Sequence, residues 1–145
     1  EHTPVKPGSE EYLHSEKYEI RQWDLGRPDS LAPYITGINR IRREHEALQD
    51  NRHLRFHACD NPSILCYSKR NDDGDSVILV CVNMDYRHVQ SGWVEFSPPA
   101  VGLPEQPPFV VRDLLSGMSY TWRGFWNFIE LDPRSQPVHI FSLEQ

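Results

Sequence analysis

Residues 76–84 read Ser-Val-Ile-Leu-Val-Cys-Val-Asn-Met, and every position from Val77 to Val82 is apolar. Consecutive side chains of a β-strand point to opposite faces of the sheet, so an unbroken apolar run indicates burial on both faces. This stretch therefore predicts a central strand, which in turn requires partner strands on either side.

Candidate partners lie on both sides of this run. Seven further short runs carry β-branched and aromatic residues between turn residues, at 53–59, 63–69, 91–96, 109–115, 119–122, 126–131 and 137–143. Asp72-Asp73-Gly74-Asp75 predicts a hairpin turn, Ser116-Gly117 a second hairpin tip, and Pro98-Pro99 with 104–108 a longer surface loop. Regularly spaced short strands without a further helix predict a mainly β protein with an antiparallel sandwich.

A single helix is predicted before these strands, at 29–48. Apolar residues recur there at three- and four-residue spacing, at Leu31, Tyr34, Ile35, Ile38, Ile41 and Leu48. Asp29 or Ser30 can cap the helix. With Ser30 as the cap, Pro33 falls in the first turn, where its missing N–H costs no hydrogen bond.

A helix with a wide apolar stripe is not needed by a two-sheet sandwich that closes its own core. We therefore expect the stripe to belong against a missing upstream part, with the face that bears Tyr34, Ile35, Ile38 and Ile41 only partly covered within this chain. Residues 1–28 are irregular and rich in Pro and Gly, which is typical of a functional loop or a cut chain.

Composition excludes several classes of protein. The 145-residue chain carries a net charge of −6, which disfavours nucleic-acid binding, and the basic run 40–43 fits a solvated helix face. No apolar run has the length of a membrane span, and the first residues lack the apolar stretch of a signal peptide. Three cysteines without metal-type spacing predict reduced thiols in a cytoplasmic protein.

The chain offers little chemistry of its own. His53 and His57 share a strand pattern without an acidic partner, so we expect neither a metal site nor a cofactor. Adjacent carboxylates such as Glu10-Glu11 lie in loops, whereas retaining glycoside chemistry needs two carboxyl groups about 5–5.5 Å apart on rigid elements. We predict no catalytic residue in this chain, and no turnover by the chain alone.

A resemblance does arise in the segment 8–20, which contains Glu10-Glu11-Tyr12-Leu13-His14-Ser15-Glu16-Lys17-Tyr18. This run closely resembles bacterial maltosyltransferases of the GlgE type, members of the α-amylase superfamily, with His14 where that family has Asp. Other matching stretches follow in order: 30–43, 54–61, 65–69, 80–85, 120–122 and 127–133. Together they extend the resemblance over nearly the whole chain.

The resemblance implies a (β/α)₈ barrel followed by a C-terminal β-sandwich. Residues 1–49 would be the last loop and helix of the catalytic barrel, and 50–145 the sandwich domain. The family transfers maltosyl units from maltose 1-phosphate to α-1,4-glucan with retention, using carboxylates of earlier barrel strands. The resemblance implies that Lys17 binds the maltosyl unit, with Tyr18 and Tyr12 as further candidates. It also makes a homodimer of the intact enzyme possible.

Two alternatives remain from the sequence. One is another α-amylase relative, a trehalose synthase or branching enzyme, against which the segment 10–18 discriminates. The other is a free-standing carbohydrate-binding β-sandwich, whose sign would be exposed tryptophan side chains in a planar row. Trp93, Trp122 and Trp126 lie on predicted strands where burial is equally expected.

Overall fold

The computed structural model describes residues 3–13, 20, 22, 24–105 and 108–144, which fall into two compact units, 1–32 and 33–145. In the first unit, residues 3–13 form a hairpin. The amide of Val5 donates to the carbonyl of Glu11 at 2.9 Å, and that of Leu13 to the carbonyl of Thr3 at 2.7 Å. Gly8 has a φ of 79° at its tip, a conformation that glycine adopts without strain.

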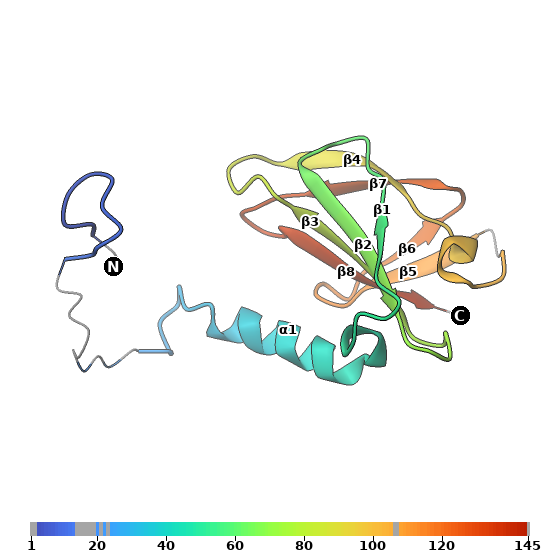
Figure 1. Cartoon of the computed structure of the whole chain (residues 1–145), viewed down its shortest axis with the longest axis horizontal. Helices are drawn as coiled ribbons and strands as arrows, with labels where there is room; N and C mark the ends of the chain where they lie inside the picture. Colours follow the sequence, from blue (N-terminus) through green and yellow to red (C-terminus); the bar gives the residue numbers. More distant parts are fainter. Residues whose placement is uncertain (1–2, 14–19, 21, 23, 106–107, 145) are drawn as a thin grey trace. The chain divides into compact units, whose positions relative to one another are not determined.

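The second unit contains all eight strands that the sequence predicts (Figure 1). Their bounds are β1 Arg55–His57, β2 Ile64–Arg70, β3 Val77–Asn83, β4 Gln90–Glu95, β5 Phe109–Asp113, β6 Ser119–Trp122, β7 Trp126–Leu131 and β8 Val138–Glu144. Six of them form one antiparallel sheet in the order β1-β2-β3-β8-β5-β6, and β4 pairs with β7 in a second sheet. The prediction of an antiparallel sandwich is confirmed.

Strand β3 lies between β2 and β8 and is buried on both faces, as its sequence predicts. Cys81 pairs with Cys66 of β2 and with His139 of β8, which fixes the register across the centre of the sheet. One side of β3 packs into a core between the two sheets. This inner core contains Leu79, Val94, Phe96, Val111, Trp122, Ile129, Leu131 and Phe141.

The other side of β3 belongs to a second core, on the outer face of the six-stranded sheet. Ile78, Val80 and Ile140 of the sheet pack there against Ile41 and Ala47, from the segment before the strands. The expectation that the sandwich closes its core without the helix is therefore wrong. A central strand that is apolar on both faces needs a cover on each, and the end of the helical segment provides the second.

The helical segment is shorter than predicted. Helix α1 spans Ala32–Glu44, and a separate 3₁₀ turn, η1, spans Glu46–Leu48. His45 is extended between them, and this break directs Ala47 onto the sheet. The Gln49 side chain donates to the carbonyl of Arg43 at 3.1 Å and so satisfies a free carbonyl of the helix end.

The start of α1 follows the sequence prediction. The amide of Ala32 donates to the Ser30 hydroxyl at 3.2 Å, as expected of a capping serine. Pro33 then lies in the first turn. Replacing either residue would affect only the helix start, because the packing against the sheet lies at the other end.

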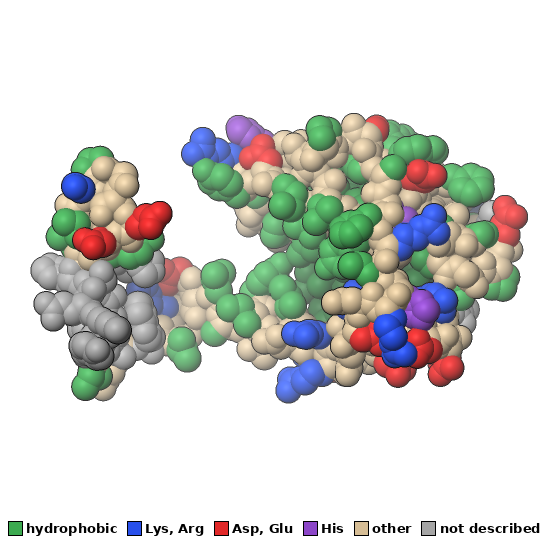
Figure 2. Space-filling view, viewed as in Figure 1, with side chains coloured by type: hydrophobic (Ala, Val, Ile, Leu, Met, Phe, Trp, Pro, Cys, Tyr) green, Lys and Arg blue, Asp and Glu red, His purple; other side chains and the backbone are tan. Residues whose placement is uncertain are grey.

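The apolar face of α1 is only partly covered, as predicted. Ile41 is buried, Ile38 is half-buried, and Tyr34 and Ile35 are 40% and 52% exposed. Across from them, on the same outer face of the sheet, Phe56 and Leu65 are also exposed. Figure 2 shows hydrophobic side chains gathered over β1, β2 and β3 above α1. We call Tyr34, Ile35, Phe56 and Leu65 the helix-side surface.

The connections confirm the predicted turns with some shifts of boundary. The amide of Asn71 donates to the carbonyl of Ser76 at 3.1 Å around the turn between β2 and β3, with Gly74 at a φ of 78°. The proline-rich stretch after β4 begins with a 3₁₀ turn, η2, which spans Pro98–Val101. Pro98 and Val101 are buried in this turn. Within the described residues, no helix combines the length and the apolar character that a membrane crossing demands.

Candidate functional site

The predicted sugar-binding residues belong to the first unit. Lys17 and Tyr18 lie outside the described residues. Tyr12 forms a bridge with Pro4 in the 3–13 hairpin, and its side chain is 42% exposed. An exposed tyrosine on a hairpin can contact a ligand, but the described residues contain no further member of this predicted site.

The two histidines considered as metal ligands are not brought together. His53 precedes β1, where its Nε2 lies 2.9 Å from a carboxylate oxygen of Asp72. His57 lies within β1 and bonds the Ser68 hydroxyl at 2.7 Å. Burial, with a smaller effect of nearby Arg55, lowers the pKa of His57 to about 4. No metal-binding cluster of His, Cys, Asp or Glu occurs in the part of the chain that is described.

The three cysteines are free, as predicted, but they gather at one place in the inner core. Cys66 and Cys81 are buried cross-strand partners, and half-buried Cys59 packs against the same cluster. Burial raises the pKa of the Cys59 thiol. Hydrogen bonding to Cys66 and burial raise that of Cys81. Cysteines packed in an apolar core behave as small hydrophobic residues, and we assign that role to all three.

A buried polar cluster forms around Asp113, the last residue of β5. Its fully buried carboxylate accepts hydrogen bonds from the amides of Ser116 and Ile140, both at 3.2 Å, and from the Ser116 hydroxyl at 2.5 Å. The Gln136 side chain also donates to it, and His139 Nδ1 lies 3.4 Å away. Sequence reasoning found only the turn at 116–117, because Gln136 and His139 are distant in the chain and carry no local signal.

The cluster holds Asp113 ionised. Burial alone would raise the pKa of Asp113, but hydrogen bonds from His139, Ser116 and the Ile140 amide outweigh it and lower the pKa to about 2. Ser, His and Asp meet here without forming a catalytic triad, because the Ser116 hydroxyl donates to Asp113 rather than to the histidine. The arrangement stabilises the β5–β6 turn and its contact with β8.

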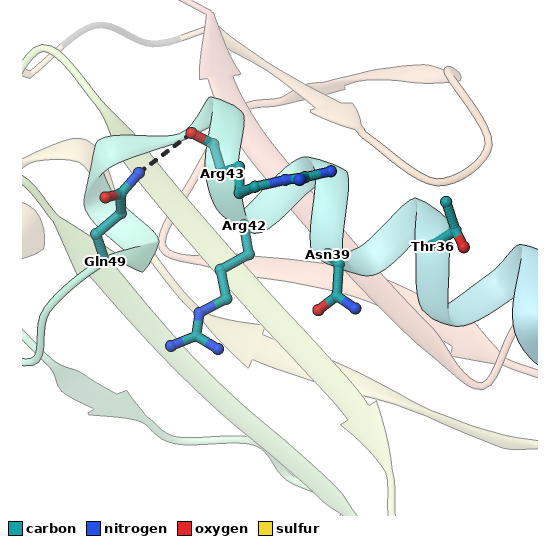
Figure 3. A pocket seen from close by; sticks show the side chains of 5 residues that line it. All are labelled: Thr36, Asn39, Arg42, Arg43 and Gln49. Carbon is teal, nitrogen blue, oxygen red and sulfur yellow. Dashed lines mark hydrogen bonds between the residues drawn. The ribbon is translucent and has the colours of Figure 1, made fainter.

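A hollow lies along the polar side of α1 (Figure 3). It measures about 490 Å³ and is lined by Thr36, Asn39, Arg42, Arg43 and Gln49. The four helix side chains spread along α1 rather than converging on one point, and both arginines are exposed. This agrees with the prediction of a solvated basic helix face, not a phosphate site.

The tryptophans separate into two groups. Trp122 is buried in the inner core at 7% exposure, whereas Trp93 and Trp126 are 48% and 50% exposed. Both exposed rings lie on the outer face of the β4–β7 sheet. Two of the three tryptophans considered for a carbohydrate-binding sandwich are thus exposed on one face of this sheet.

Comparison with known proteins gives a consistent assignment. The model of the family described as "GLGE, C-terminal" matches residues 56–143. Proteins named alpha-1,4-glucan:maltose-1-phosphate maltosyltransferase are similar to the whole chain. That of Methylacidiphilum infernorum is 44% identical over 98% of this chain and 21% of its own length, and that of Corynebacterium glutamicum is 44% identical over 100% and 22%. The one from Chlorobaculum tepidum is 42% identical over 99% and 22%.

The chain thus spans about a fifth of the length of these relatives. The match includes the sandwich and extends to the residues before it. Because the family model covers more than half of the sequence and agrees with the β-rich structure, this chain belongs to the GLGE C-terminal family.

Proposed function

We propose that this chain is the C-terminal part of a maltosyltransferase that transfers maltosyl units from maltose 1-phosphate to the non-reducing end of α-1,4-glucan with retention. The observation that carries the proposal is the 44% identity over essentially the whole chain to proteins of that name. The segment 10–18, which distinguishes these proteins from trehalose synthases and branching enzymes, supports it. The homodimer of the intact enzyme stays a prediction.

Residues 1–49 would then be the last loop and helix of the catalytic barrel, and 50–145 the sandwich domain. The helix-side surface supports this division. Tyr34 and Ile35 on α1, and Phe56 and Leu65 on the sheet, leave apolar area exposed. A hollow of about 260 Å³ also remains beside Tyr34, next to Leu115 and Val138. We propose that the remaining four fifths of the parent protein supplies the cover.

The parent, and not this chain, would carry the catalytic carboxylates. Several acidic side chains here take part in local structure, among them Asp72 with Arg52 and His53, and Asp113 in its buried cluster. We expect the intact parent to release phosphate from maltose 1-phosphate when glycogen is supplied. The purified 145-residue chain should show no turnover, and turnover abolished by mutating one of its own acidic residues would overturn this.

We further propose that Lys17 donates hydrogen bonds to hydroxyls of the maltosyl unit, with Tyr12 and Tyr18 beside it. The support is its position in the matched segment and the three donors of an ammonium group. In the parent, Lys17→Ala should reduce kcat/KM for maltose 1-phosphate by about ten- to hundredfold, equivalent to a charge-assisted hydrogen bond of about 1.5–3 kcal/mol.

Lys6→Ala is the matched control, because Lys6 is an exposed lysine of the same unit that lies outside the segment 10–18. It should leave the kinetics unchanged. Lys17→Arg should recover only part of the activity, since a planar guanidinium does not reproduce the ammonium geometry. Near-normal kinetics of Lys17→Ala, with an unchanged melting temperature, would reduce Lys17 to a solvated loop residue.

The cysteines support a cytoplasmic location. All three are free although Cys66 and Cys81 are direct cross-strand neighbours, an arrangement that a reducing compartment preserves. We propose on this ground that the parent acts in the cytoplasm, where phosphorylated sugars and glycogen are handled.

A further inference from the structure

The outer face of the β4–β7 sheet bears three exposed aromatic rings. Side chains alternate along both strands, so that Val94, Ile129 and Leu131 enter the inner core while Trp93, Trp126 and Phe128 face outward. The outward rings are 48%, 50% and 52% exposed. We call the outward residues of this sheet, Ser91, Trp93, Glu95, Trp126, Phe128 and Glu130, the aromatic face.

The register places these residues in three cross-strand pairs. Trp93 lies opposite Phe128, with ring centroids 5.6 Å apart and planes inclined at 64°. Trp126 lies opposite Glu95. It is two residues from Phe128 along β7, so the Cα atoms of Trp126 and Phe128 are roughly 7 Å apart. Ser91 and Glu130 form the third pair. The face thus alternates apolar rings with carboxylates over the length of a short oligomer.

The backbone beneath these rings is held from the side. The segment 58–60 runs beside β4: the Asp60 carboxylate accepts from the Trp93 amide at 2.7 Å, and the Asp60 amide donates to the Trp93 carbonyl at 3.2 Å. At Gly92 an added Cβ would lie 2.9 Å from the sulfur of Cys59, so only glycine allows this close approach. The platform is therefore organised before any ligand binds, which lowers the entropic cost of binding.

A small hollow lies beside residues 123–125, which directly precede Trp126 in the chain. It measures about 120 Å³ and is bordered by Phe109, Phe125, Pro98, Arg123 and Glu105. Phe125 is 60% exposed, and its carbonyl accepts from the Phe96 amide at 2.7 Å, which fixes the turn. The hollow combines an apolar wall with a guanidinium donor and a carboxylate acceptor.

The chemistry of the aromatic face selects among possible occupants. The helix-side surface consists of apolar and tyrosine side chains, which suit burial against another protein surface. The aromatic face interleaves Glu95 and Glu130 with the rings, and an apolar protein surface that covered it would have to desolvate both carboxylates. The net charge of −6 and these carboxylates also disfavour nucleic acid and anionic lipid.

A neutral sugar chain fits this face. The C–H faces of pyranose rings pack on aromatic planes, and their hydroxyls donate to flanking carboxylates. We propose that the aromatic face, with the hollow beside residues 123–125, binds a chain of glucose units and is a non-catalytic α-1,4-glucan-binding surface. The choice of an α-glucan rests on the proposed function, whereas the preference for a neutral sugar rests on the face itself. Such a surface raises the local concentration of acceptor near a catalytic site.

The test measures retardation of the 145-residue chain in native gels that contain glycogen, and its titration with maltoheptaose by calorimetry. The wild-type chain should be retarded. Trp93→Ala and Trp126→Ala should each weaken maltoheptaose binding by roughly tenfold, since each removes one stacking ring, and the double variant should migrate as in a gel without glycogen. Phe56→Ala, an exposed aromatic on the opposite sheet, should bind as the wild type does.

Each contrary result has a distinct meaning. A wild-type chain without retardation, or a double variant that is retarded like the wild type while melting at the same temperature, overturns the proposed surface. Equal binding of cellohexaose and maltoheptaose overturns the α-glucan assignment. None of these results depends on turnover, so failure of the maltosyltransferase assay in the parent is a separate finding about the proposed function.

Discussion

An Asp113→Ala chain should lose about 3–5 kcal/mol of its free energy of unfolding, because the change removes a fully buried, ionised acceptor and leaves its donors unsatisfied. The amides of Ser116 and Ile140 and the Gln136 side chain all lose their partner. Urea unfolding followed by circular dichroism measures the loss. Asp73→Ala, in the exposed turn between β2 and β3, is the matched control and should change stability by less than about 0.5 kcal/mol.

The same residue should make stability depend on acid. The pKa of Asp113 is lowered to about 2 in the folded chain. Its contribution to the free energy of unfolding is therefore complete above its unfolded-state pKa, near 3.8. It is lost as the pH falls from about 4 towards 2. Asp113→Asn should flatten the stability profile in that window; a profile as steep as that of the wild type would mean that the carboxylate is not held ionised by its neighbours.

Phe96→Ala should be comparably destabilising, by about 3–5 kcal/mol. The Phe96 ring is 1% exposed and contacts the rings of His57, Phe109 and Trp122, so it joins the residues after β4 to the six-stranded sheet. Its truncation leaves a cavity among rigid aromatic neighbours, which relax little. The midpoint of chemical unfolding measures the effect.

Phe56→Ala removes the same side chain from the exposed helix-side surface and is the control for this change. We expect it to shift the free energy of unfolding by about 0.5 kcal/mol or less. A Phe96→Ala chain as stable as Phe56→Ala would show that the aromatic cluster does not couple the two sheets.

The strands could be predicted from sequence because their signals are local. The alternation of Trp126 to Leu131 and the apolar run of β3 each specify a face, and all eight strands follow. The pairing of β8 with both β3 and β5 could not be predicted, since several antiparallel orders satisfy the same local pattern. Likewise, the seven-residue spacing of Ile41 and Leu48 suits one helix, whereas the structure has a break at His45 that no local pattern indicates.

Site prediction was limited by the same distinction between local and distant signals. The segment around Lys17 identifies a family by its order of residues, which is visible in the sequence alone. The Asp113 cluster joins Ser116, Gln136 and His139 through the fold, and no spacing rule connects them. Exposure of Trp93 and Trp126 could not be decided either, because a strand pattern gives the alternation of faces but not which face meets solvent.

The position of β8 also bears on how this domain is made. Strand β8, residues 138–144, lies in the middle of the six-stranded sheet, between β3 and β5. During synthesis the β1-β2-β3 half and the β5-β6 hairpin emerge before β8, the first with β3 and the second with β5 as an unpaired edge. The sheet closes only after β8 has been synthesised, so until then the nascent chain exposes an aggregation-prone edge.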